Sequence, residues 1–300
     1  MEALPAEAPA FLRTPAAAVA VGELAREPDR WKDAGKAHDG DLDPGHFLNL
    51  GDDGRIAGGL RLTDLPPTRA EYERLLRRAG SDGWRAGYLP YSIIEGWQQL
   101  AKDFAYLRAD EAGARDTPAA AHRAWLAADG ERRQQLILRD LGVFAHFVGD
   151  GSQPLHVSNH FDGWGPFPNP LGFTQEKVHA PFEGAFVRAF VSLEAVRARV
   201  PGFRDRPIAI TTETIRYLSA TNATVVPFYR LYQAGGFVPG DARGVAFAAA
   251  RLAAGADELR DLVVGAWRTS AEEKVGWPEI SVADVEAGRL DPFESLYGAD

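Results

Sequence analysis

The chain has 300 residues, a net charge of −9 and no cysteine. This length buries a sizeable core without cross-links, and the lack of cysteine excludes disulfides and thiolate metal sites. The acidic charge argues against a broad basic surface for duplex nucleic acid or anionic membrane, although bound metal would still supply positive charge within a narrow cleft.

Apolar residues recur at helical spacing almost throughout, and no strand-length segment alternates convincingly. In chain order, helices are predicted over residues 15–29, 68–79, 91–112, 117–127, 131–149, 181–199, 209–233 and 241–273. The third of these is expected to kink near Pro90, and the chain from Trp277 onward is predicted to be irregular.

Residues 151–174 are rich in Gly, Pro, Asn and aromatic residues and predict a long loop. Loops of this length in compact domains are usually functional or disordered, and the aromatic residues argue against disorder. With no internal repeat or linker, the predicted fold is all-α: one multi-helix domain spanning residues 1–300, with long loops around a metal site.

The termini and the hydropathy bear on location. No run of about 18 apolar residues is present, so no transmembrane span is predicted. The opening residues lack a basic region and are broken by prolines, which is not the pattern of a signal peptide. Location therefore stays open, with secretion or a periplasmic site expected for a longer precursor.

Three of the seven histidines lie within the stretch HFVGDGSQPLHVSNH. His146 and Asp150 are four residues apart at the end of a predicted helix, so their side chains share one face. His156 follows after a turn containing Pro154. This density of imidazole and carboxylate groups indicates a candidate metal site.

A second pair at the same spacing, His179 and Glu183, follows the loop. Two such pairs around a turn that bears another histidine suit a multinuclear site, because imidazole and carboxylate without sulfur favour zinc in a catalytic setting. A histidine four residues from a carboxylate is also often just a charge-assisted hydrogen bond. The spacing alone leaves both interpretations open.

These motifs resemble the zinc ligands of the S1/P1 nuclease and zinc-dependent phospholipase C superfamily. That family's signature is a helix ending in His-Phe-x-Gly-Asp, then x-x-Gln-Pro-(Leu/Met)-His, and after a variable loop His-x3-(Asp/Glu). The residues that match it are His146, Asp150, Gln153, Pro154, His156, His179 and Glu183. An earlier family pattern, Trp-x-Asp followed by His-Phe, is matched by Asp33 and His46.

The resemblance implies two zinc sites. The first zinc would be held by Asp33, His46, His146 and Asp150, and the second by His156, His179 and Glu183. The family's third zinc shares the aspartate at the position of Asp150 and uses an amino-terminal tryptophan and a nearby histidine. This chain begins with Met1 and has no histidine before His38, so a third site is expected only for a longer precursor.

The activity implied by the resemblance is phosphodiester hydrolysis, with Asp33 orienting or deprotonating the attacking water and Asp150 shared between metal ions. Single-stranded nucleic acid and a phospholipid head group are the two candidate substrates. The His-Phe pair at 46–47 and the aromatic loop favour the nuclease, whereas Glu183 is the carboxylate of the phospholipase branch. A non-catalytic, zinc-stabilised helical binding protein is a third possibility, and no stable protein partner is inferred.

The long loop supplies further candidates. Trp164, Phe167 and Phe173 are predicted either to form a wall on which bases stack or to pack within the loop itself. His160 is a candidate contact for substrate phosphate, the alternative being an ordinary loop residue.

Overall fold

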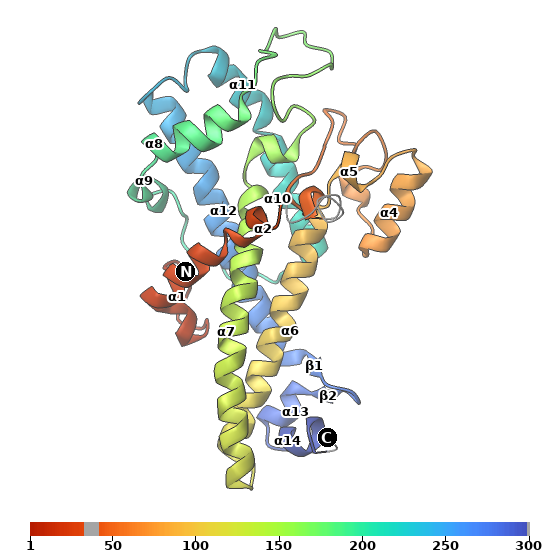
Figure 1. Cartoon of the computed structure of the whole chain (residues 1–300), viewed down its shortest axis with the longest axis vertical. Helices are drawn as coiled ribbons and strands as arrows, with labels where there is room; N and C mark the ends of the chain where they lie inside the picture. The colour runs from red at the N-terminus through yellow and green to blue at the C-terminus, as the bar shows by residue number, and fades with distance from the viewer. Residues whose placement is uncertain (33–41, 299–300) are drawn as a thin grey trace.

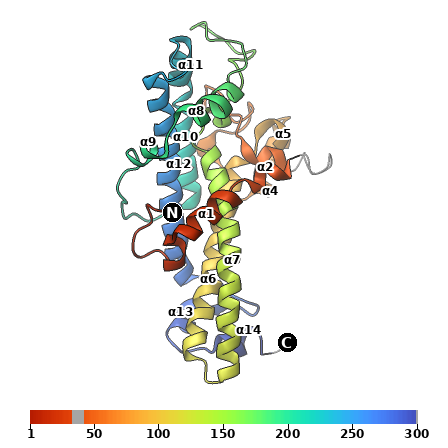
Figure 2. The same ribbon diagram turned by 60° about the vertical axis from the view of Figure 1, so that its left-hand side comes forward.

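The computed structural model describes residues 1–32 and 42–298, and within them it confirms the predicted all-α fold (Figure 1). Two long helices, α6 (Leu89–Asp116) and α7 (Ala120–Asp150), run side by side upward from the lower end of the molecule in Figure 1. Helix α12 (Ala242–Thr269) packs against both, as the turned view in Figure 2 also shows. The main hydrophobic core lies between these helices and includes Ile93, Phe104 and Phe144.

Helix α6 is longer than predicted and is not kinked at Pro90. The proline lies in the first turn of the helix, where a missing N–H breaks no intrahelical hydrogen bond. The residue therefore begins the helix instead of bending it.

Helix α7 is continuous, so the prediction of two separate helices over 117–127 and 131–149 is wrong. Gly130 lies in its interior and is buried against α6, where a Cβ at this position would contact Asp110 and Leu107. Glycine costs a helix interior only about 1 kcal/mol relative to alanine. Packing along the whole α6–α7 pair outweighs that cost.

Other predicted helices are divided by local signals. The segment 15–29 forms α1 (Pro15–Leu24) and α2 (Glu27–Trp31), because Pro28 cannot continue a hydrogen-bonded helix from α1 and instead lies in the first turn of α2. Similarly, 209–233 forms α10 (Ile210–Asn222) and α11 (Val225–Gln233), with Pro227 in the first turn of α11.

The segment 181–199 also divides. A π-helix, η5 (Pro181–Val187), continues into α8 (Arg188–Phe190), and α9 (Leu193–Arg197) begins at Ser192, whose hydroxyl accepts a hydrogen bond from the amide of Ala195. A side-chain cap of this kind starts a new helix.

Two predictions agree closely with the structure. Helix α4 (Arg69–Arg78) is capped by Thr68, whose hydroxyl accepts from the amide of Glu71. The predicted loop 151–174 contains only one short element, the 3₁₀ helix η4 (Pro154–Val157). Among the described residues, the other short helices before the loop are η1 (Ala10–Arg13), η2 (Asp43–His46), η3 (Leu62–Asp64) and α5 (Gly83–Ala86).

The C-terminal tail is not irregular as predicted. After η6 (Ser270–Glu272), strands β1 (Lys274–Val275) and β2 (Ile280–Ser281) pair antiparallel, and α13 (Val282–Glu286) and α14 (Pro292–Leu296) follow. These elements pack on alanines of α6 at the lower end of the molecule in Figure 1. They are too short to show a helical or strand period in the sequence.

No described helix has both the length and the apolar character needed to cross a membrane. The one feature of the fold that matters most for the site is the C-terminal end of α7. There the long loop, η2, η5, α2 and α12 gather around the last turn of the helix (Figures 1 and 2).

Candidate metal centre

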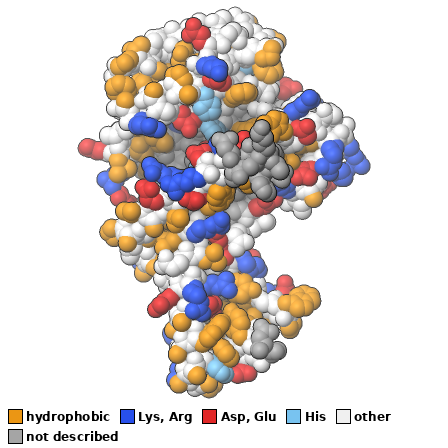
Figure 3. Space-filling view, in the orientation of Figure 1, with side chains coloured by type: hydrophobic (Ala, Val, Ile, Leu, Met, Phe, Trp, Pro, Cys, Tyr) orange, Lys and Arg blue, Asp and Glu red, His pale blue; other side chains and the backbone are white. Residues whose placement is uncertain are grey.

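Four segments bring the predicted ligands of the described residues together at the end of α7. His146 and Asp150 lie on its last turns, and His156 lies in η4 just beyond. His46 ends η2, while His179 immediately precedes η5 and Glu183 lies within it. Figure 3 shows histidine side chains exposed in a hollow of the upper half of the molecule, beside acidic side chains.

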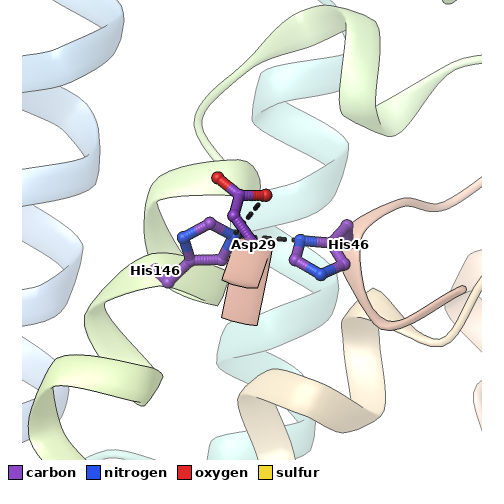
Figure 4. A group of neighbouring side chains, drawn as sticks. All are labelled: Asp29, His46 and His146. Carbon is purple, nitrogen blue, oxygen red and sulfur yellow. Dashed lines mark hydrogen bonds and ion pairs between the residues drawn. The ribbon is translucent and has the colours of Figure 1, made fainter. Parts of the chain in front are cut away.

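The first group of ligands consists of Asp29, His46 and His146, whose donor atoms lie within 4.8 Å of one another. Nε2 of His146 lies 2.9 Å from Nδ1 of His46 and 3.9 Å from Oδ1 of Asp29. The three side chains point toward one another from α2, η2 and α7 (Figure 4). This group contains two predicted ligands and one, Asp29, that was not predicted.

The second group consists of His156, His179 and Glu183, all of them predicted ligands, again with donor atoms within 4.8 Å of one another. The Nε2 atoms of the two histidines are 3.1 Å apart. Oε2 of Glu183 lies 2.8 Å from Nε2 of His179 and 3.3 Å from Nε2 of His156.

Asp150 lies between the two groups. Its Oδ2 is 3.1 Å from Nδ1 of His46 and 3.3 Å from Nε2 of His146, whereas its Oδ1 is 3.6 Å from Nδ1 of His156. Its side chain is almost entirely buried, at 11 % exposure. One carboxylate therefore faces histidines of both groups.

Backbone carbonyls fix the orientation of three of these histidines. Nδ1 of His146 donates to the carbonyl of Ala25 at 2.8 Å, and Nδ1 of His156 donates to the carbonyl of His46 at 2.7 Å. Nδ1 of His179 lies 3.1 Å from the carbonyl of Phe161. Because a carbonyl only accepts, the proton of each neutral ring is held on Nδ1 and the lone pair of Nε2 faces the group.

A residue that is not itself a ligand, Gln153, orients the second group. The side-chain amide of Gln153 donates to Oε2 of Glu183 at 3.0 Å, and its carbonyl oxygen accepts from the amide of Leu155 at 2.9 Å. Metal-binding residues are typically oriented by outer hydrogen bonds of this kind.

The charges of the centre are strongly coupled. Burial opposes ionisation of His156, but Asp150 and Glu183 outweigh it and raise the pKa of His156 to about 9. Burial likewise opposes ionisation of Asp150, yet the surrounding histidines hold the pKa of its carboxyl well below the usual range. The pKa of Glu183 is lowered in the same way by His156 and His179. The carboxylates thus favour positive charge at these positions.

The donor set fits zinc. Two Nε2 lone pairs that face each other at 3.1 Å beside a carboxylate oxygen require either protons or a cation between them, and nitrogen with oxygen ligands is typical of catalytic zinc. The second group offers three donors, a number that leaves a coordination position open. Asp33, the remaining predicted ligand, lies outside the described residues.

An open cleft runs over the centre. Two cavities of about 570 and 590 Å³ share Lys32, His156, Phe161 and His179 in their walls. The side chains of Phe161 and Trp84 are 52 % and 55 % exposed, and both line the first cavity. A substrate in the cleft would therefore meet the second ligand group and two solvent-accessible aromatic rings together.

The predicted aromatic wall is wrong for two of its three residues. Trp164 and Phe173 are buried, and they pack with Tyr229 in a second hydrophobic cluster, so packing within the loop is confirmed for them. His160 is also buried: it stacks on Trp164 at 3.6 Å, and its Nε2 lies 3.0 Å from Oδ1 of Asp52. It has a structural role in the loop and is not a phosphate contact.

Sequence reasoning missed Asp29, Phe161 and Trp84. Asp29 lies four residues before Asp33, but the Trp-x-Asp pattern points past it to the later aspartate. The two aromatic residues carry no local signal, because their exposure depends on how the loop and α5 pack.

Comparison with family models, with curated proteins and with solved structures gave no match for the chain.

Proposed function

We propose that the protein is a zinc-dependent phosphodiester hydrolase acting on single-stranded nucleic acid, and a divergent member of the superfamily that its ligand motifs resemble. The observation that carries the proposal is the convergence of the Nε2 atoms of His156 and His179 on Oε2 of Glu183, next to the His46–His146 group, in an open cleft. A fold needs no such arrangement for its own stability, because facing lone pairs repel.

Each group would hold one zinc ion. His46, His146 and Asp150, with Asp29 or Asp33, would hold the first, and His156, His179 and Glu183 the second. Zinc in such a site supplies Lewis acidity toward phosphoryl oxygens. Asp150 would bring the two sites into electrostatic contact, and Gln153 would keep the carboxylate of Glu183 in place.

A carboxylate at the cleft would accept the proton of the attacking water. Asp33 is our proposed acceptor. Among the described residues, Asp29 has the same chemistry: its side chain is 60 % exposed, and it lies at the edge of the first group with Lys32 Nζ 2.7 Å from Oδ1.

Single-stranded nucleic acid fits the walls of the cleft better than a phospholipid head group does. Exposed aromatic faces such as Phe161 and Trp84 stack on any base. Lys32, Arg85 and Arg188 line the same cleft and can neutralise backbone phosphates. These features explain how a chain with a net charge of −9 would bind a polyanion.

The test compares four substrates with zinc-loaded protein: bis-p-nitrophenyl phosphate, single-stranded DNA, duplex DNA and phosphatidylcholine vesicles. We expect turnover of the first two, abolished by chelation and by Asp150→Asn. Turnover of phosphatidylcholine alone would move the assignment to the phospholipase branch. Zinc binding without turnover of any diester would contradict the proposal and leave a zinc-stabilised binding protein.

A further inference from the structure

A third cavity, of about 360 Å³, adjoins the metal centre on the side of α12. Asp29, His146, Asp150 and Glu183 line both this cavity and the 590 Å³ cavity over the centre. The cleft therefore continues past the ligands toward α12. The residues of that helix in its wall are Ala248, Arg251 and Leu252.

The packing of α12 turns Arg251 toward the end of α7. A Cβ at Gly255 would lie 3.1 Å from Oγ of Ser152, two residues after Asp150, so α12 passes close to the segment that follows α7. Arg251 precedes Gly255 by four residues and shares that face of the helix. Arg251 therefore lines the cleft at the end beside α12.

Arg251 differs from the other arginines of α12 in having no partner within the described residues. Arg243 pairs with Asp241, Arg260 with Asp261, and Arg268 with Glu7. Arg251 is only partly exposed, and it forms no hydrogen bond or ion pair with any side chain or carbonyl in the described ranges.

Its surroundings make that isolation costly. Phe182, Val187 and Leu252 are among the apolar residues of the cavity wall, and burial lowers the pKa of the guanidinium. A cation partly removed from water is disfavoured unless an anion or hydrogen-bond acceptor compensates it. The carboxylates in the cavity wall already have other partners: Asp29 pairs with Lys32, Asp150 faces the histidines, and Glu183 faces His156, His179 and Gln153.

We propose that Arg251 binds an anionic phosphoryl oxygen of the substrate at the α12 end of the cleft. A guanidinium offers parallel N–H donors that match two oxygens of a phosphate group. This inference rests on the proposed function for the identity of the anion. Arg251 would thus be a cation of the protein in the same cavity wall as His146, Asp150 and Glu183. Its positive charge would hold the phosphate close to the metal centre.

The first test measures binding without chemistry. Zinc-loaded protein, freed of excess metal, is titrated with inorganic phosphate by isothermal titration calorimetry. Arg251→Met keeps the packing of the apolar stem and removes the charge, and we expect about tenfold to hundredfold weaker phosphate binding. Arg251→Lys, which keeps the charge but not the paired donors, should recover part of the affinity.

Arg230→Ala provides the matched control. Arg230 is an exposed arginine of α11, and the variant changes the net charge of the protein by the same amount. We expect parental phosphate affinity. Weakening equal to that of Arg251→Met would mean that overall charge accounts for the effect, and it would overturn the inference, as would parental affinity in Arg251→Met or a parent that does not bind phosphate.

Kinetics separate this inference from the proposed function. With bis-p-nitrophenyl phosphate as substrate, Arg251→Met should lower kcat/KM about tenfold or more, with zinc content unchanged. Phosphate binding that depends on Arg251 in a protein that turns over no diester would contradict the proposed function and leave the anion site intact. Turnover with an unchanged kcat/KM in Arg251→Met would contradict only the role of Arg251.

Discussion

Oδ1 of Asp150 lies 3.6 Å from Nδ1 of His156, while the other oxygen of the same carboxylate faces the first ligand group. One negative charge therefore serves both groups. Removing this charge should weaken metal binding at both groups, including the second group, which Asp150 approaches only through Oδ1.

We first predict that the purified protein carries close to two zinc ions per chain and that Asp150→Asn carries clearly fewer. Asparagine keeps the shape of the side chain but loses the charge that favours cations at both groups. Elemental analysis after dialysis without chelator gives the stoichiometry. A parent without zinc, or a variant with the parental content, would be incompatible with this view of the centre.

A second prediction concerns His179→Ala. The ring links the loop to η5 through the ligand group, so zinc binding contributes to the stability of the folded protein. The variant should melt several degrees below the parent in zinc and at nearly the same temperature in excess chelator. Scanning calorimetry under both conditions is decisive, because a difference that persists in chelator would indicate a purely structural role. His156→Ala should have the same effect on melting, and both variants should bind less zinc than the parent.

Gln153 allows a third prediction, about orientation instead of ligation. Gln153→Leu removes the hydrogen bond to Glu183 but no ligand atom. We expect zinc affinity at the second group to fall about tenfold to hundredfold, the usual effect of losing an outer partner. Gln175→Leu, at an exposed position before η5, is the control. Competition with a chromophoric chelator measures the zinc affinity of both variants and of the parent. Equal affinity of Gln153→Leu and the parent would show that Glu183 does not need the hydrogen bond from Gln153.

The fourth prediction separates nucleic acid from small diesters. Stacking on one aromatic ring contributes about 1–3 kcal/mol per base, so Phe161→Ala should raise KM for single-stranded DNA several-fold or more. Turnover of bis-p-nitrophenyl phosphate should change little. Phe190→Ala, in α8 and also 38 % exposed but outside the walls of the cleft, serves as the control and should leave both substrates unaffected. An equal effect of Phe161→Ala on both substrates would count against base stacking.

The fifth prediction concerns pH and lies far from the centre. Burial, and then the charge of Asp129, raise the pKa of Asp110 to about 8, and neither carboxylate oxygen has a hydrogen-bond partner in the described part of the chain. Arg132, Arg133 and Tyr297 are the other titratable groups facing this pair. The neutral carboxyl is therefore the form that the folded helix pair favours.

The sign follows from proton counting. Between the unfolded pKa near 4 and the folded value, the native state binds more protons, so stability falls as pH rises, by at most about 1.4 kcal/mol per pH unit. Asp110→Asn should remove this loss and gain on the order of 2 kcal/mol over the parent between pH 5 and pH 8. Urea unfolding at several pH values measures the difference in the free energy of unfolding between Asp110→Asn and the parent. A difference that does not change with pH would show that Asp110 is not the titrating group.

Helical periodicity predicted most of the fold because α4, α6 and α12 each bury a regular apolar stripe. It failed where other forces decide. The predicted break between residues 127 and 131 is absent, because close packing against α6 keeps the helix continuous through Gly130. The strands and helices after Glu273 are held by contacts with α6 and are too short to have a readable period.

The residues of the candidate centre likewise fall into those that the sequence predicted and those that only the structure reveals. His146 with Asp150, and His179 with Glu183, were readable because helical spacing places each pair on one face. Asp29 was not, since its proximity to His146 arises from the packing of α2 on α7, 117 positions away along the chain. The position of Arg251 in the cleft was likewise not predictable from the sequence, because it depends on the packing of α12 close to Ser152.

The unbroken course of α7 also has a practical consequence. Its 31 residues correspond to about 45 Å of helix, and the candidate centre occupies one end while the turn at 117–119 forms the other. A fluorophore, an affinity tag or a surface anchor inserted in that turn would sit remote from the cleft. The protein could thus be immobilised or labelled there with its substrate path left open.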